Sequence, residues 1–177
     1  MLQEAFHKFY SNPNSARKGM VVKMKAVLQR VTSASVSVDG QTVGECGKGL
    51  MILLGVAEGD TEEDGDRLLQ KIIKLRIFED EAGKMNRSVT DVGGELLIIS
   101  QFTLLANYRH GNRPDFLGAA APAEAKRLYE IFTEKAKGYV SHVGNGIFGA
   151  DMKVSLINDG PVTIVMDSDV LKSGKNS

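Results

Sequence analysis

Apolar and polar positions alternate along the residues that follow Met24, and this pattern predicts a half-buried β-strand. In KAVLQRVTSASVSVDG, residues 25–40, valines alternate with serines before Asp39-Gly40, which has the composition of a hairpin turn. The next letters, QTVGECGKG, supply a return strand and a glycine-rich link. Residues 50–59, LMILLGVAEG, form a continuous apolar run of strand length, which is typical of a central strand buried on both faces.

Two later segments have the apolar spacing of amphipathic helices. Thr61 is placed to cap the first helix, because Asp64 follows three residues later and four aliphatic side chains between 68 and 73 share one face. Pro122 favours the start of the second helix, and Gly138 favours its end. These signals predict two main helices.

Apolar runs between and after the helices predict four further elements. They are a strand and hairpin in LRIFEDEAGKMN, a second buried strand in GGELLIISQFTLL, and a pair of strands in MKVSLIN and VTIVMD. The order is therefore βββ-α-ββ-α-ββ. Because consecutive strands mostly lack a crossover helix between them, we expect an α/β (α+β) fold with a mixed, largely antiparallel sheet.

Composition and charge limit the function only loosely. The 177 residues suit one domain, and 22 Lys and Arg balance 22 Asp and Glu, so no overall field draws the protein to nucleic acid or membranes. The single cysteine, Cys46, excludes an internal disulfide and favours a reducing compartment. No apolar run approaches the ~20 residues that cross a bilayer. We expect a cytoplasmic protein with no membrane contact.

The two ends of the chain differ from the rest. Residues 1–23 are polar and poor in acidic residues, which is typical of a disordered or expression-derived extension and also resembles an organellar targeting peptide. We interpret residues 24–167 as one domain and 168–177 as a flexible tail.

Standard searches for catalytic chemistry find little. The three histidines have no metal-ligand spacing, and neither a G-x-S-x-G elbow nor a phosphate loop is present. The glycines of HVGNGIFG follow a helix, so a loop that packs glycine against a neighbouring strand is the better interpretation than a dinucleotide site. We predict no metal and no cofactor.

Two stretches remain as candidate sites. In SQFTLL, residues 100–105, a buried strand runs into polar side chains, which fits either an active site or a strand that leaves the core. In LINDGPVTIVMD, a proline directly after Gly160 removes a backbone donor at the start of a strand. An ordinary trans turn between two strands would account for Gly160-Pro161, since only ~5–6% of X-Pro bonds are cis.

Together these stretches resemble the D-aminoacyl-tRNA deacylase family. The resemblance rests on MKAVLQRV, SQFTLL, GNRPDF, FGADM and NDGPVT, in order, from Met24 to Asp167. It implies a deacylase-type fold with a barrel-like core. It also implies a homodimeric hydrolase that cleaves the ester between a D-amino acid and the 3′-terminal adenosine of tRNA. Such an enzyme serves proofreading in translation quality control.

The resemblance implies a specific role for the Gly-Pro step. It implies that the Gly160-Pro161 bond is cis and enters the active site of the other subunit. A backbone wall there would clash with an L side chain and leave room for D side chains, so selection would be steric rejection. Glycine has no side chain to reject, so glycyl-tRNA mischarged on a non-cognate tRNA should also react.

The same resemblance assigns candidate residues. They are Gln101, Phe102 and Thr103 for catalysis; Ser100, Ala120, Gly160 and Pro161 for substrate binding; Arg30 as a support of the Gly-Pro loop; and Arg109 and Arg113 as phosphate contacts. Thr103 is either a nucleophile or a positioning group. In the second case, which we favour, the 2′-hydroxyl of the terminal ribose helps activate water, and backbone amides near Gln101–Thr103 bind the oxyanion.

Other functions stay open on the sequence alone. A sister deacylase that edits L-alanine from mischarged threonine tRNA shares the architecture, although the intact SQFT argues against it. A non-catalytic nucleic-acid-binding domain, such as one acting at a replication origin, and a purely structural partner domain belong to different classes. Neutral net charge makes DNA binding a poor candidate for the only role.

Overall fold

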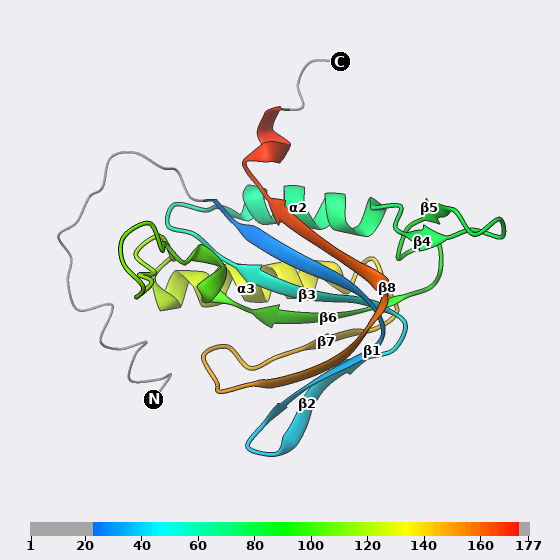
Figure 1. The fold of residues 1–177 in the computed structure, drawn as a ribbon, viewed down its shortest axis with the longest axis horizontal. Helices are drawn as coiled ribbons and strands as arrows, with labels where there is room; N and C mark the ends of the chain where they lie inside the picture. The colour runs from blue at the N-terminus through cyan, green and yellow to red at the C-terminus, as the bar shows by residue number, and fades with distance from the viewer. Residues whose placement is uncertain (1–22, 174–177) are drawn as a thin grey trace.

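The computed structural model describes residues 23–173 as a curved mixed sheet with two α-helices on one face (Figure 1). The elements are β1 (Lys25–Val38), β2 (Gln41–Cys46), β3 (Gly49–Gly55), α2 (Glu62–Lys74), β4 (Phe78–Glu79), β5 (Met85–Arg87), β6 (Glu95–Ser100), the 3₁₀ turn η1 (Phe102–Leu105), α3 (Pro122–Ala136), β7 (Val143–Asn145), β8 (Lys153–Asp167) and the 3₁₀ turn η2 (Val170–Ser173).

The sheet is mixed, as the sequence predicts. Its order is β2-β1-β3-β6-β7, and β8 pairs with β1. The long strand β1 is antiparallel to β2, β3 and β8, whereas β3, β6 and β7 run parallel. The predicted α/β class, with two main helices, is therefore confirmed.

Two glycines bring the edge strands β2 and β7 together and nearly close the sheet into a barrel. A Cβ added to Gly144 would lie 2.2 Å from the carbonyl oxygen of Glu45, and one added to Gly44 would lie 2.4 Å from that of Asn145. Only glycine permits this approach. The prediction that the HVGNGIFG segment packs a glycine against a neighbouring strand is confirmed for Gly144, but the expected loop is wrong at Val143–Asn145, which form the strand β7 paired with β6.

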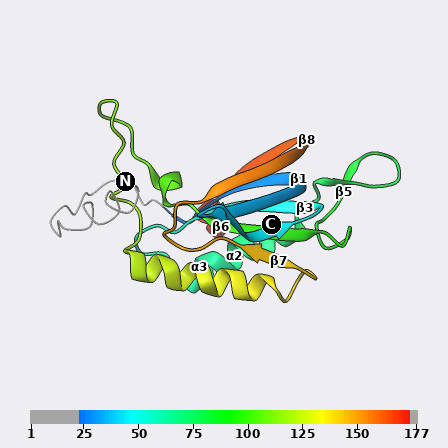
Figure 2. The same cartoon turned by 90° about the horizontal axis from the view of Figure 1, so that it is seen from below.

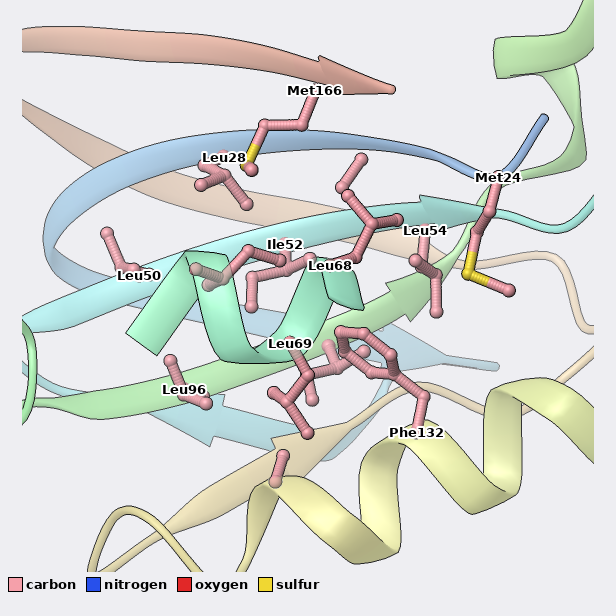
Figure 3. Close-up of a cluster of buried hydrophobic side chains, with 14 of the residues drawn as sticks. Met24, Leu28, Leu50, Ile52, Leu54, Leu68, Leu69, Leu96, Phe132 and Met166 are labelled. Carbon is pink, nitrogen blue, oxygen red and sulfur yellow. The ribbon is translucent and has the colours of Figure 1, made fainter. Parts of the chain in front are cut away.

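The main core lies between the sheet and the helices. Figure 2 shows α2 and α3 along the same side of the sheet. Leu68 and Leu69 of α2 and Phe132 of α3 point toward the strands, and all three are at most 2% exposed (Figure 3). Thr61 begins α2 as predicted, since its amide donates to the carboxylate of Asp64. Because β1, β3 and β6 share this apolar cluster with both helices, the end of β6 is held in a fixed position.

Two further predictions, both about strands, are wrong. Strand β6 ends at Ser100, and the following residues form the η1 turn rather than more strand. The expected strand pair around Gly160-Pro161 is one strand, β8, whose two halves both pair with β1 across irregularities between Gln29 and Ser33. The long partner strand β1 keeps both halves of β8 on one edge, which local turn chemistry does not indicate.

The two ends of the chain differ in how far the structure describes them. The predicted extension, residues 1–23, lies outside the described residues except for Lys23. The segment predicted as a flexible tail starts with packed residues: Ser168 is fully buried, its amide donates to Met24, and Leu171 packs on the core. In the part of the chain that the structure describes, none of the helices is both long enough and apolar enough to cross a membrane.

Candidate active site

A cavity of about 170 Å³ opens where β6 ends. Ser100, the last residue of β6, stands opposite Leu54 of the parallel strand β3, and both line the cavity. The carboxyl ends of parallel strands leave side chains and backbone groups beyond the last hydrogen-bonded pair, which is where α/β proteins commonly build sites. The polar run of SQFTLL therefore lies at the cavity, as one of the two sequence interpretations requires.

The η1 turn forms one wall of this cavity. The amide of Gln101 donates to the carbonyl of Leu54 at 2.8 Å, and the chain then turns through Phe102–Leu105. The side-chain amide of Gln101 donates to the hydroxyl of Thr103, which is exposed at the cavity. Gly55 makes the turn possible, because a Cβ there would lie 2.9 Å from the carbonyl oxygen of Gln101.

Small and aromatic residues form the opposite wall. Ala120 is 4% exposed and its amide donates to the carbonyl of Val56, which ties this wall to the end of β3. Phe148 and the segment 149–152 complete the lining. Tyr129 lies beside this wall: its ring centroid is 6.1 Å from that of Phe148, and its hydroxyl donates to the carbonyl of Ile98 at 2.8 Å and lies 3.4 Å from that of Gly146, just before the wall. Burial raises the pKa of Tyr129 to about 12, so the hydroxyl stays a donor.

The cavity offers little acid–base chemistry. Among the described residues that line it, Asp151 is the one ionisable side chain, and Lys153 pairs with it at 2.9 Å. Neither His110 nor His142 is among the lining residues. Within residues 23–173, no group of three or more His, Cys, Asp or Glu side chains is placed to hold a metal ion. The described lining therefore offers mainly polar side chains and backbone dipoles, which can stabilise a developing charge when they are held in position.

The Gly160-Pro161 step lies away from this cavity. Its peptide bond is cis, both residues are exposed, and neither lines the cavity. On either side of the step, β8 residues form pairs with Gln29 and Val31, the neighbours of Arg30 in β1. Arg30 itself pairs with Leu50 of β3, and Leu50 pairs with Leu96 of β6. The step is thus level with the start of β6, four residues from Ser100, or about 13 Å along the strand.

The buried side chain of Arg30 contacts the backbone next to the Gly-Pro step. Its guanidinium donates to the carbonyl of Asp159 at 3.0 Å and to the carbonyl of Ile77 at 2.7 Å, and lies over the Phe78 ring at 6.0 Å. The residue is 5% exposed. Burial is tolerated because the fork-shaped donor has two carbonyl acceptors. Arg30 therefore fixes the backbone just before Gly160.

Arg109 and Arg113 lie on a hairpin that follows η1. Asn107 and Asp115 close it through two backbone hydrogen bonds of 2.8 and 2.9 Å. Both arginines are exposed, and neither lines the cavity. Because the hairpin directly follows the η1 turn, which lines the cavity, both arginines place positive charge on the segment next to the cavity wall.

The structure thus divides the predicted site residues into two groups. The cavity brings together Ser100, Gln101, Phe102, Thr103 and Ala120, whereas Arg30, Arg109, Arg113, Gly160 and Pro161 lie outside it. The sequence analysis missed the wall formed by Phe148–Met152. The FGADM motif, at residues 148–152, could have indicated this wall, because it is one of the motifs that carry the family resemblance and no role was assigned to it.

The comparisons with known proteins agree with the resemblance. The family described as D-Tyr-tRNA(Tyr) deacylase matches residues 27–167. A D-aminoacyl-tRNA deacylase of Sulfurihydrogenibium sp. is 62% identical over 84% of this chain and all of its own. One of Variovorax paradoxus is 58% identical over 80% of this chain and 97% of its own.

Two solved structures are also similar. The c-Myc DNA Unwinding Element Binding Protein has a TM-score of 0.77 at 44% identity and covers 81% of this chain and 97% of its own. A probable eukaryotic D-amino acid tRNA deacylase has a TM-score of 0.72 at 18% identity, over 81% of this chain and 98% of its own, which shows a shared fold.

The family match and the relatives define a hydrolase that acts on a carboxylic ester bond. More specifically, the chain belongs to the D-Tyr-tRNA(Tyr) deacylase family. The predicted family, enzyme class and deacylase-type fold are therefore confirmed.

Proposed function

We propose that this protein hydrolyses the ester bond of D-aminoacyl-tRNA and releases a free D-amino acid and tRNA. The observation that carries the proposal is the cavity at the end of β6, which gathers Ser100–Thr103 and Ala120 in a chain of this family. The small Ala120 leaves room for the terminal adenosine, and the η1 wall faces the ester. Glycyl-tRNA on a non-cognate tRNA is a further proposed substrate, because glycine lacks the side chain on which rejection depends.

We propose that a second copy of the chain completes each site with its own Gly160-Pro161 step. The step is exposed, and it lies three strands across the sheet from β6 and about 13 Å along the strand direction from Ser100 at the cavity of its own protomer. Strand β8 also presents exposed apolar side chains, among them Ile157 at 62% and Val165 at 73%, which a homodimer interface would cover. The inserted backbone would meet an L side chain and leave a D side chain free.

We assign catalysis to position and an oxyanion contact rather than to a protein nucleophile. Asp151, the one ionisable side chain among the described lining residues, pairs with Lys153, and a hydroxyl that no base activates is a poor nucleophile. The amide of Gln101 is already bonded to Leu54, so the oxyanion contact falls to the amide of Thr103 in the first turn of η1, where amides lack an acceptor within the turn. The 2′-hydroxyl of the terminal ribose then helps activate water.

Thr103→Ala is expected to retain substantial activity. The substitution removes the hydroxyl and its contact with Gln101 but keeps the amide, so kcat should fall by about tenfold or less. Single-turnover hydrolysis of D-tyrosyl-tRNA measures this. An inactive variant, together with an acyl-enzyme trapped on the wild type, would instead assign Thr103 as the nucleophile.

Gly55→Ala is expected to reduce kcat/KM by about 10- to 100-fold, because a displacement of the η1 wall by a fraction of an ångström misplaces the oxyanion donor. The added Cβ would lie 2.9 Å from the Gln101 carbonyl oxygen and 3.1 Å from the Leu104 Cβ. Gly47→Ala is the matched control, since its Cβ meets only the Glu95 carboxylate, at 3.4 Å. Equal activity of the two variants would show that the η1 position does not matter.

The direct test of the proposed function compares matched esters. Purified protein is incubated with D-tyrosyl-, L-tyrosyl- and L-alanyl-tRNA, and release of the amino acid is followed over time. The proposal predicts rapid release from the D-ester alone. Preferred hydrolysis of the L-alanyl ester would identify the sister editing activity, and no hydrolysis of any ester would remove the proposed function.

A further inference from the structure

We propose that the hairpin of residues 107–115 is a stacking platform for an unpaired nucleotide of the tRNA acceptor end, with Tyr108 as the stacking ring. This inference rests on the proposed function and extends the binding site beyond the terminal adenosine.

Tyr108 is the starting observation. At 77% exposure it is the most exposed of the large apolar side chains in the described part of the chain. Aromatic rings offer flat surfaces on which bases stack whatever their sequence, and single-stranded RNA is recognised largely in this way. An exposed ring beside positive charge is therefore suited to a nucleobase.

The hairpin presents Tyr108 on a fixed base. The preceding residue, Asn107, exchanges two backbone hydrogen bonds with Asp115, and its side-chain amide donates to the Asp115 carboxylate at 2.9 Å. Phe116, directly after the hairpin, packs edge to face on Phe102 with ring centroids 5.1 Å apart. Because Phe102 lines the cavity, the hairpin and the site are mechanically connected.

The distance along the chain suits the nucleotides next to the terminal adenosine. Thr103 lines the cavity, and Tyr108 follows five positions later, which limits the distance between their Cα atoms to about 18 Å. The 3′ end of tRNA is single-stranded, so its bases are free to stack on protein. A strand that leaves the cavity along the η1 wall would meet the hairpin first.

Charge around the ring favours RNA over protein as the partner. Arg109, His110 and Arg113 are exposed on the same hairpin, and its one carboxylate, Asp115, is used in closing the hairpin. The whole chain has zero formal net charge, so this cluster is a local concentration of positive charge. A ring combined with nearby guanidinium groups is the combination that binds single-stranded nucleic acid.

The test compares Tyr108→Ala, Tyr108→Phe and wild type on D-tyrosyl-tRNA and on D-tyrosyl-adenosine, which lacks the other nucleotides. We expect Tyr108→Ala to lower the ratio of kcat/KM for tRNA to kcat/KM for the adenosine ester by about tenfold, mainly through KM, since stacking acts on binding. Tyr108→Phe keeps the ring and should keep the ratio. Tyr139→Ala, which removes a 41% exposed tyrosine three residues after the end of α3, is the matched control.

The outcomes separate this inference from the proposed function. An unchanged ratio in Tyr108→Ala would overturn the platform while leaving the deacylase activity intact. A change in the sedimentation of Tyr108→Ala would also overturn it, because Tyr108 would then be a contact between copies of the chain. Wild-type protein that hydrolyses neither ester would contradict the proposed function itself.

Discussion

Replacing Gly160 by alanine is expected to reduce hydrolysis of D-tyrosyl-tRNA by about 100-fold or more, because the loop that we propose completes the site of a second copy would be misplaced. The added Cβ would lie 2.7 Å from a guanidinium nitrogen of Arg30 and 3.1 Å from a methyl group of Val162. The φ angle of +121° is also one that L side chains rarely adopt. Steady-state kcat/KM on D- and L-tyrosyl-tRNA measures the effect.

Gly40→Ala is the matched control for this prediction. Gly40 also has a positive φ, +78°, but a Cβ there would meet nothing within 4 Å, and the residue lies in the β1–β2 turn. Gly40→Ala should therefore introduce a similar backbone strain and keep full activity. Near-normal activity of Gly160→Ala would show that the step has no part in the site.

Arg30→Met is expected to lower both stability and activity. The substitution keeps apolar bulk beside Phe78 but leaves the carbonyls of Asp159 and Ile77 without their donor, which should lower the free energy of unfolding by about 2–4 kcal/mol. The loop before Gly160 loses its support, so kcat/KM should fall by more than about tenfold. Urea unfolding and kinetics at a temperature where the variant stays folded measure the two effects separately.

Arg127→Met is the comparison for the arginine prediction. The Arg127 side chain is 48% exposed and pairs with Glu62 and Glu124 on the helix surface. Exposed pairs of this kind contribute about 0–1 kcal/mol, so stability and activity should hardly change. If Arg30→Met behaved like Arg127→Met, the guanidinium would not be the support of the loop.

Local patterns predicted the framework of the fold because periodicity and caps reflect short-range forces. The alternation in β1, the apolar run of β3 and the capping pair of Thr61 and Asp64 all correspond to observed elements. The prediction of two strands around Gly160-Pro161 was wrong. Turn residues there suggest a hairpin, whereas pairing with the long strand β1 keeps the chain running in one direction.

The site was predictable only in part. Polar residues directly after the buried β6 run form the η1 wall, but on their own they fit a strand that leaves the core as well as an active site. The wall that contains Phe148 depends on Tyr129, which joins it to β6 across the fold through its hydroxyl. No local pattern in the sequence encodes that long-range contact.

The most direct test of the account is complementation between two inactive variants. Gly160→Ala carries an intact cavity and a faulty loop, whereas Thr103→Phe carries an intact loop and a bulky ring at the exposed cavity rim. In co-expressed protein about half of the dimers are mixed, and each mixed dimer has one site with both intact parts. We therefore predict recovery to about one quarter of the wild-type rate on D-tyrosyl-tRNA. A rate no higher than the sum of the two variants alone would contradict a loop that acts across the subunit boundary.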